Sequence, residues 1–315
     1  MPPSLVLTRL AAEALELLYQ HRLVSTPQVR QTLCPGYTER SVIRFMDELK
    51  ARGLADCVRA RGATGPGHRL WFVTRLGAEV VEAVPNRAET RRRLLTPALA
   101  AGQLQAHTLA VNDVGIAFLT AARERGHDFG PQSWRHEVGH DLGRRARRGG
   151  GLLIADAVIR YWMSLPDGRT SVRYRFIELD RANRLVDDAA AKLARYARLR
   201  EVWGEPRFSS GTGLEDESPA WPLLYRHFPG VIFVLANSDR VNLDRRLTSL
   251  LALCRADVDI SGRNGISVFF VFFAELVRRG PFAPIFQRMG DQRRVNWLGE
   301  EVNDEPSGVE LEMAG

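Results

Sequence analysis

Three acidic residues in the second half of the chain have the types and the spacing of a metal-binding site. Glu178 and Asp180 are two residues apart in a predicted strand, so both side chains project from one face. Asp156 lies in the preceding apolar strand, and the turn sequence Pro166-Asp167-Gly168 predicts a hairpin that brings it alongside. Carboxylates that converge at strand ends suit Mg²⁺ or Mn²⁺. Such an ion could activate water and stabilise the charge that develops on a phosphodiester.

A lysine lies on the helix predicted to follow these strands. The chain has only two lysines, Lys50 and Lys192, among 44 basic residues that are otherwise arginine. Lys192 could hold an attacking water or neutralise a transition state, and lysine shifts its pKa on burial more readily than arginine. For any single acid, a surface ion pair with an arginine is an equally good explanation. The ordered set of Asp156, Glu178, Asp180 and Lys192 is less easily explained in that way.

The elements that must position these residues form a predicted sheet covered by helices. Strands are expected at Trp134 to Val138, Leu152 to Trp162 and Arg173 to Asp180, and a helix from Leu185 to Trp203. Near-continuous apolar runs at 231–236 and 266–273, separated by a helix, are typical of buried strands in such a sheet. The fold class expected for this region is α+β or α/β, with a mixed sheet flanked by helices.

The first eighty or so residues have a different pattern, with three helices followed by a hairpin. Apolar stripes and capping residues predict helices near 8–24, 25–33 and 38–52, and strands at 54–59 and 69–74 enclose a Gly- and Pro-rich tip. This order resembles the winged helix-turn-helix family. The resemblance implies that the third helix enters the major groove of DNA and that the hairpin touches the backbone. The residues expected to contact DNA there are Arg40, Arg44, Arg59, Arg61 and Arg69. A module used only for protein contacts is the alternative.

The charge of the chain also favours a polyanionic partner. The formal net charge is +7 and the pI is about 9.8. A second basic cluster, Arg144, Arg145, Arg147 and Arg148 next to three glycines, could wrap a phosphate chain, although a solvated loop is the alternative. We therefore expect double-stranded DNA as the partner.

Several other classes of function find no support in the sequence. No run approaches the roughly 18 unbroken apolar residues of a membrane span, and the N-terminus lacks the pattern of a signal peptide, so a cytoplasmic protein without a membrane segment is expected. Three widely spaced cysteines predict neither disulfides nor a cysteine zinc site. Tyr161, Tyr174 and Tyr196 could be covalent nucleophiles, but no two-histidine metal motif accompanies them and core packing explains them better. Asp113, on a predicted helix that also carries His107, is a weaker candidate for a site residue.

Short motifs in both halves are similar to those of the replication-relaxation family of plasmid and mobile-element proteins. They are Trp134-Arg-His-Glu137, Ile154-Ala-Asp156-Ala157, Phe176-Ile-Glu178-Leu-Asp180-Arg181, Lys192 with Tyr196, and the helix from His107 to Asp113. That family includes MobC-type relaxases, which are similar to PD-(D/E)xK nucleases with a restriction-endonuclease-like fold. The resemblance implies plasmid or mobile-element DNA binding and metal-dependent nicking, with Asp156 and Glu178 as the two motif acids and Glu137 as an accessory acid.

The chain departs from the nuclease motif at two positions. Alanine precedes Asp156 where the motif has proline, and Asp180 stands where the motif has lysine, so the lysine is expected to have moved to Lys192. There are therefore two alternatives to a nicking enzyme. One is a non-catalytic DNA-binding accessory protein of replication or transfer, and the other is a winged-helix transcriptional regulator with a degenerate nuclease fold. The expected organisation is a DNA-binding module at 1–84, a helical linker at 85–106, a nuclease-like domain at 107–290 and an acidic flexible tail at 291–315. The oligomeric state is left open.

Overall fold

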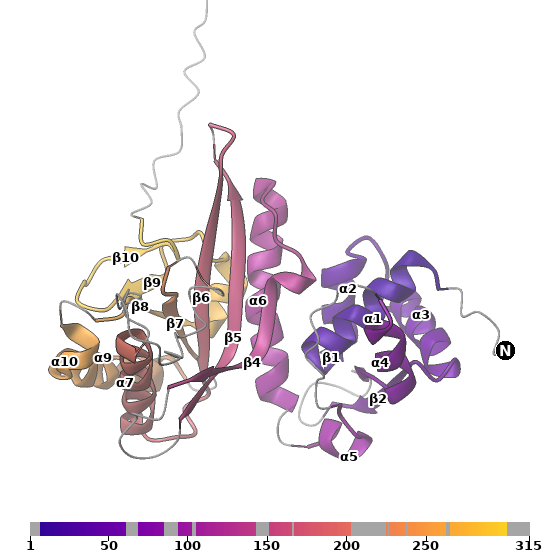
Figure 1. The fold of residues 1–315 in the computed structure, drawn as a ribbon, viewed down its shortest axis with the longest axis horizontal. Coiled ribbons are helices and arrows are strands. Elements are labelled where there is room, and N and C mark those ends of the chain that lie inside the picture. The colour runs from indigo at the N-terminus through magenta and orange to yellow at the C-terminus, as the bar shows by residue number, and fades with distance from the viewer. Residues whose placement is uncertain are drawn as a thin grey trace, which may run out of the picture.

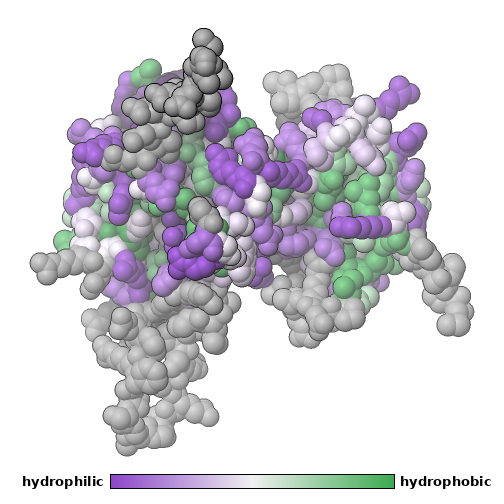
Figure 2. All heavy atoms as spheres, turned by 90° about the horizontal axis from the view of Figure 1, so that it is seen from above, coloured by the Kyte–Doolittle hydropathy of each residue, from purple (hydrophilic) through white to green (hydrophobic). Residues whose placement is uncertain are grey.

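The structure is a computed structural model. It describes residues 7–60, 69–84, 94–102, 105–142, 151–165, 167–202, 225, 227–236, 239–262 and 265–300. In the view from above (Figure 2), hydrophilic residues are interspersed with hydrophobic ones at the surface of the described residues, and 26 % of the residues of the chain are charged. No described helix is both long and apolar enough to cross a membrane.

The N-terminal module contains three helices and then a hairpin, in the order that the sequence predicts (Figure 1). Its elements are α1 (Arg9–His21), β1 (Val24–Ser25), α2 (Thr26–Leu33), α3 (Glu39–Ala51), β2 (Ala55–Arg59), β3 (Arg69–Val73) and α4 (Arg75–Glu82). The strands form an antiparallel sheet in the order β1-β3-β2. Apolar side chains from the helices and the sheet form one core, which includes Leu15, Val42, Met46 and Trp71.

Side-chain caps explain where these helices begin. Thr8, Ser25, Thr38 and Thr74 each accept a hydrogen bond from a backbone N–H of the first turn. Ser25 and Gln28 form a reciprocal capping box at the start of α2. These are the residue types that mark helix starts in a sequence, so the order of elements in the module was predictable from local signals.

The second region is a mixed sheet of seven strands in the order β10-β9-β8-β7-β6-β5-β4. β4 (Trp134–Asp141), β5 (Leu152–Ser164) and β6 (Thr170–Asp180) are antiparallel, β7 (Gly230–Leu235) and β8 (Val268–Phe272) run parallel to β6, and β9 (Phe286–Arg288) and β10 (Arg294–Val295) complete the sheet. The fold class expected from the sequence, a mixed sheet flanked by helices, is confirmed.

Helices cover the sheet on both faces (Figure 1). The face with Trp134, Ile177 and Trp297 packs against α6 (Gln105–Arg125) and α11 (Phe273–Arg279). The other face, with Phe176 and Phe233, packs against α7 (Val186–Val202), α9 (Arg240–Ala256) and α10 (Val258–Ser261). Short helical segments at α5 (Pro97–Ala100) and η1 (Pro131–Ser133) lie before α6 and before β4. The sheet is thus the middle layer between α6 and α7.

The end of the described chain differs from the sequence-based expectation of a flexible tail from residue 291. β10 adds a seventh strand, and the Trp297 ring is fully buried against Phe118 and Tyr161. Arg175 also donates a hydrogen bond to the Trp297 carbonyl. The sheet region therefore continues to residue 300, because apolar side chains that look isolated in a polar segment fill the core.

Candidate active site

Asp156 lies at a gap in the sheet. β4 and β5 pair at His136↔Ala157 and again at Val138↔Ala155, while the β5–β6 ladder ends at Ala157↔Ile177. In this register Asp156 lies between Glu137 on one neighbouring strand and Glu178 on the other, with no backbone pair to either. Its Oδ2 instead accepts a hydrogen bond of 2.8 Å from the Leu179 N–H. The interruption leaves the carboxylate room to extend between the strands.

Glu178, on β6, is the most buried of the acids, with only 2 % of its surface exposed. Its Oε2 forms an ion pair with Lys192 Nζ, and its Oε1 accepts a short hydrogen bond from the Tyr196 hydroxyl. Lys192 and Tyr196 are four residues apart on α7 and so lie on one face of that helix. Lys192 Nζ is also 3.6 Å from Asp156 Oδ1. One ammonium group therefore contacts both carboxylates.

A histidine completes the cluster from the opposite helical layer. His107 lies near the start of α6, and its Nε2 is 3.5 Å from Asp156 Oδ1. About a third of its side chain is exposed, as is about a quarter of the Lys192 side chain, whereas Glu178 is enclosed. The cluster of Asp156, Glu178, Lys192, Tyr196 and His107 thus opens to solvent on the side of Asp156, and a phosphate group could approach there.

The two carboxylates have opposite electrostatic environments. Burial, reinforced by the nearby negative charge of Asp156, raises the pKa of Glu178 to about 8 even though Lys192 and Tyr196 oppose the rise. Burial acts in the same direction on Asp156, but contacts with His107, Lys192 and the Leu179 N–H outweigh it and hold its pKa at about 2. Glu178 therefore depends on a neighbouring cation for its charged form, and Asp156 stays ionised.

Asp180 shares a face with Glu178 but has a different partner. Its Oδ2 accepts a hydrogen bond of 2.5 Å from Arg246 Nε, and its Oδ1 accepts one of 3.1 Å from Nη2, so α9 holds it in a bidentate pair. Its Oδ1 also accepts from the Ala182 N–H. The expected set of three converging acids is therefore reduced to two.

Glu137, the expected accessory acid, has a partner outside the cluster. It forms an ion pair with Arg22, at the end of α1, and more than half of its side chain is exposed. It also has a positive φ of 49°, a backbone conformation that is unusual for a residue other than glycine. Its position opposite Asp156 is consequently a feature of the strand register and not a contact between carboxylates.

The donor set suits a divalent ion held by two carboxylates. Asp156 Oδ1 and Glu178 Oε2 both lie against one Nζ atom, so a cation between them would meet two hard oxygen ligands. Within the described residues, no group of three or more His, Cys, Asp or Glu side chains has the arrangement of a complete metal site. Any such ion would therefore need further ligands from water or from a phosphate, as Mg²⁺ commonly does.

Comparison with known families gives the cluster its context. The sequence matches the replication-relaxation family over residues 15–208, which is more than half of the chain. The chain belongs to the replication-relaxation family. The match includes all five residues of the cluster and ends before β7. A search of curated proteins and a search of solved structures each found no match.

Membership of the replication-relaxation family suggests a role in the replication or relaxation of plasmid or mobile-element DNA and implies an interaction with DNA. Arg40, Arg44 and Arg59 are exposed on α3 and β2 and have no ion-pair partner among the described residues. Arg69 instead pairs with Asp47 at 2.5 Å, as Lys50 does with Asp56 at 2.7 Å. The other arginines expected to contact DNA lie outside the described residues: Arg61, Arg144, Arg145, Arg147 and Arg148.

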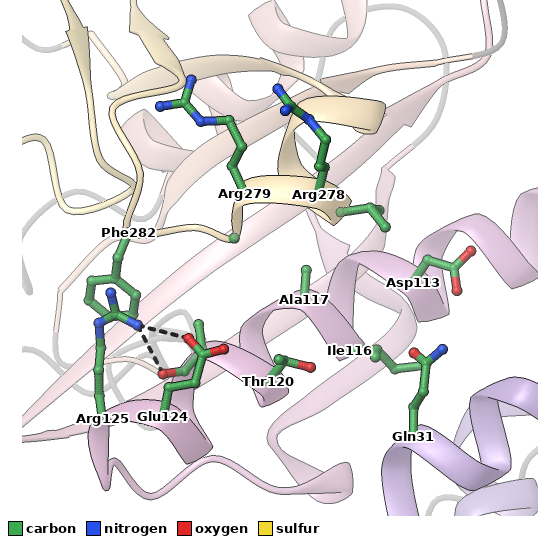
Figure 3. Close-up of a pocket in the computed structure, with 13 residues that line it drawn as sticks. Gln31, Asp113, Ile116, Ala117, Thr120, Glu124, Arg125, Arg278, Arg279 and Phe282 are labelled. Atoms are coloured by element: carbon green, nitrogen blue, oxygen red, sulfur yellow. Dashed lines mark hydrogen bonds and ion pairs between the residues drawn. The ribbon is translucent and has the colours of Figure 1, made fainter. Parts of the chain in front are cut away.

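Asp113, the weaker candidate from the sequence, lies away from the cluster. It faces a cavity of about 190 Å³ between α2, α6 and α11, with Gln31 at the same end (Figure 3). Its Oδ1 accepts a hydrogen bond of 2.7 Å from Gln28, and burial raises its pKa to about 6. Arg278 and Arg279 extend away from α6 in Figure 3. Asp113 therefore contributes to the junction with the N-terminal module.

Two members of the cluster were not predicted as site residues. The sequence places His107 only within a helix motif and favours core packing for Tyr196. Tyr196 is indeed fully buried, but its hydroxyl is bonded to Glu178. Tyr161 is also buried, and its hydroxyl oxygen lies 3.0 Å from His127 Nδ1. The four-residue spacing of Lys192 and Tyr196 was a usable signal, whereas nothing local linked His107 to a residue 49 positions later.

Proposed function

We propose that this replication-relaxation protein binds double-stranded DNA of a plasmid or mobile element and nicks one strand in a reaction that depends on Mg²⁺ or Mn²⁺. The observation that carries the proposal is the contact of a single ammonium group, Lys192 Nζ, with both Asp156 and Glu178. Two acids and a lysine at a gap between strands, with one acid partly accessible to solvent, form a site that could hold a divalent ion for phosphodiester hydrolysis. The arrangement supports the likeness to PD-(D/E)xK nucleases inferred from the sequence.

Each residue of the cluster has a role in this proposal. Asp156 and Glu178 would hold the divalent ion, which when bound acts as a Lewis acid toward the phosphate. Lys192 would then be released from the ion pair to orient water or to neutralise charge on the phosphate. Tyr196 holds the inner oxygen of Glu178 through its hydroxyl. Asp180, held by Arg246, would take no direct part.

The N-terminal module would supply most of the DNA contact. Its order of helices and hairpin supports the interpretation as a winged helix, with the exposed Arg40 and Arg44 on α3 facing the groove or the phosphates. Arg59 extends the same basic surface onto the hairpin. The basic segment at 144–148 lies between β4 and β5 in the sequence, outside the described residues, and its contact with phosphate remains a prediction.

The decisive experiment is incubation of the purified protein with supercoiled plasmid in the presence of Mg²⁺, Mn²⁺ or EDTA. We expect open-circular product only with a divalent ion, and loss of that product in Asp156→Asn. Asp180→Asn is the matched control, because this acid is on the same strand but outside the cluster. If the wild type binds DNA but nicks no plasmid with either metal, the enzymatic proposal is wrong.

One observation favours the non-catalytic alternative, a DNA-binding accessory protein of replication or transfer. Asp180, which stands where the nuclease motif has lysine, is fully engaged with Arg246 and offers neither a third ligand nor a cation. In that case DNA binding would persist unchanged when Asp156 or Lys192 is replaced, and no divalent ion would bind between Asp156 and Glu178.

A further inference from the structure

Helix α6 connects the N-terminal module to the candidate site. On its module side, Gln28 of α2 donates hydrogen bonds to the Leu109 carbonyl at 2.9 Å and to Asp113 at 2.7 Å. Asn112 of α6 donates in return to the Leu23 carbonyl at 2.8 Å. Gln28 and Asn112 are both buried, so these bonds form inside the junction, where unpaired polar groups are costly.

The same helix reaches Asp156 at its other side. His107 is two residues from Leu109, which corresponds to about 3 Å along the helix axis. Farther along α6, Gly115 packs against the Trp134 ring so closely that a Cβ atom there would overlap with the ring. The helix is therefore held by the module on one side and by β4 on the other. A shift of His107 along with the helix would break one of these contacts.

We propose that His107 is a positioning residue that fixes the orientation of the Asp156 carboxylate, and that the N-terminal module sets the place of His107 through α6. This inference rests on the proposed function, in which Asp156 holds the divalent ion. It adds that the two regions form one working unit and that the metal site is assembled only when the module is docked.

The geometry around Asp156 gives the physical reason. Oδ2 is held by the Leu179 N–H, and Oδ1 lies between His107 Nε2 and Lys192 Nζ. If a bound ion took the place of Lys192 between the carboxylates, His107 would be the side chain, among the described residues, that still restrains Oδ1. Groups that orient a metal-binding carboxylate typically change metal affinity by about 10–100-fold when they are removed.

The test is a titration of the full-length chain with Mn²⁺ in the absence of DNA, in which electron paramagnetic resonance measures the concentration of free Mn²⁺. His107→Ala is expected to weaken Mn²⁺ binding by about 10–100-fold. His107→Gln keeps an N–H donor at similar reach and is expected to bind Mn²⁺ within a few-fold of the wild type. His127→Ala is the matched control, since His127 follows the far end of α6 and contacts Tyr161 instead.

Cleavage assays on the same variants add a second readout. For His107→Ala we expect the Mn²⁺ concentration needed for half-maximal nicking to rise by the same factor as the binding constant, with little change in the rate at saturating Mn²⁺. Mn²⁺ affinity unchanged in His107→Ala would overturn the positioning role. So would a loss in His107→Gln as large as in His107→Ala, because the N–H donor alone should suffice.

The contribution of the module is tested separately with Gln28→Met, which keeps the side-chain length but removes the hydrogen bonds between Gln28 and α6, together with its half of the capping box at the start of α2. We expect Mn²⁺ binding to weaken by several-fold in a folded protein, whereas Arg9→Ala, at an exposed position on α1, should leave it unchanged. Unaltered Mn²⁺ binding in Gln28→Met would overturn the link through α6. A wild type that binds no Mn²⁺ at all would instead overturn the proposed metal site, and this inference with it.

Discussion

Glu178 and Asp180 lie two residues apart on one strand and on one face of the sheet, and both are buried beside a cation, yet their partners differ. Glu178 is enclosed by Lys192 and Tyr196 from α7, close to a second carboxylate, and its pKa is raised to about 8. Asp180 meets Arg246 of α9 in a bidentate pair. Lys192 and Tyr196 thus leave Glu178 in a site that a divalent ion could enter, whereas Arg246 binds both carboxylate oxygens of Asp180.

The difference shows that the type of cation beside a buried acid separates the two roles. Arginine offers a planar fork that matches a carboxylate and stays charged, so the Asp180 pair is suited to holding β6 and α9 together. Lysine is a compact charge that can move away when an ion arrives. Substitutions can therefore separate the candidate site around Glu178 from the structural ion pair of Asp180.

Asp156→Asn is expected to have the largest effect. Without this charge the pair of carboxylates is broken, and nicking should fall by about 10⁴-fold, the scale seen when a group essential to the chemical step is removed. DNA affinity should stay the same or rise slightly, since a negative charge is removed from a surface that meets a polyanion. Plasmid nicking and gel-shift assays measure the two quantities on one protein sample.

Asp180→Asn should have the opposite profile. The ion pair with Arg246 is largely buried, and breaking such a pair by removing one partner costs about 3 kcal/mol or more. We expect the free energy of unfolding in urea to fall by this amount, while nicking per folded molecule remains near that of the wild type. Loss of nicking in a folded Asp180→Asn protein would contradict the division between the two acids.

Lys192→Arg and Arg246→Lys each replace one type of basic side chain by the other and keep the positive charge. Lys192→Arg conserves charge but puts a bulkier, always-charged group between Asp156 and Glu178, so nicking should fall by about 100-fold. Arg246→Lys should leave nicking intact and lower stability, because one ammonium cannot reproduce the two parallel hydrogen bonds to Asp180. Equal nicking by Lys192→Arg and wild type would show that the lysine is not needed for chemistry.

The basic surface of the N-terminal module should affect binding and not chemistry. Arg40→Ala combined with Arg44→Ala should weaken duplex binding by about tenfold and reduce the slope of log affinity against log salt by up to about 2. Arg9→Ala, an exposed arginine on α1 paired with Glu13, is the control. Unchanged affinity and slope in the folded double variant would remove α3 from the DNA-binding surface.

The last prediction concerns the pH dependence of stability. Because the pKa of Glu178 is raised from 4.5 to about 8 in the folded protein, the native state binds more protons than the unfolded state between these values. The stabilising contribution of Glu178 is therefore complete below about pH 4.5 and is lost as the pH rises toward 8. Glu178→Gln should flatten the decline in unfolding free energy between pH 5 and 8, while Glu13→Gln, at a partly exposed position on α1, should not.

Local patterns in the sequence determined much of the fold. The caps at Ser25, Thr38 and Thr74, the glycine after α3 and the alternation in β5 and β6 predict element types and order, because helix starts and strand faces depend on residues only a few positions apart. The grouping of Asp156, Glu178 and Lys192 also follows from strand alternation and one short hairpin.

The partner of each charged group was decided only by the tertiary structure. Asp180 lies with Arg246, 66 positions away, and Asp156 meets His107 from the opposite helical layer, although strand alternation alone treats Glu178 and Asp180 alike. Trp297 joins the core two residues after β10, a strand too short to show a period in the sequence. A sequence sets which face a side chain occupies over a few residues, but which helix covers that face depends on how distant layers pack, and that packing separates the candidate site from the structural ion pair.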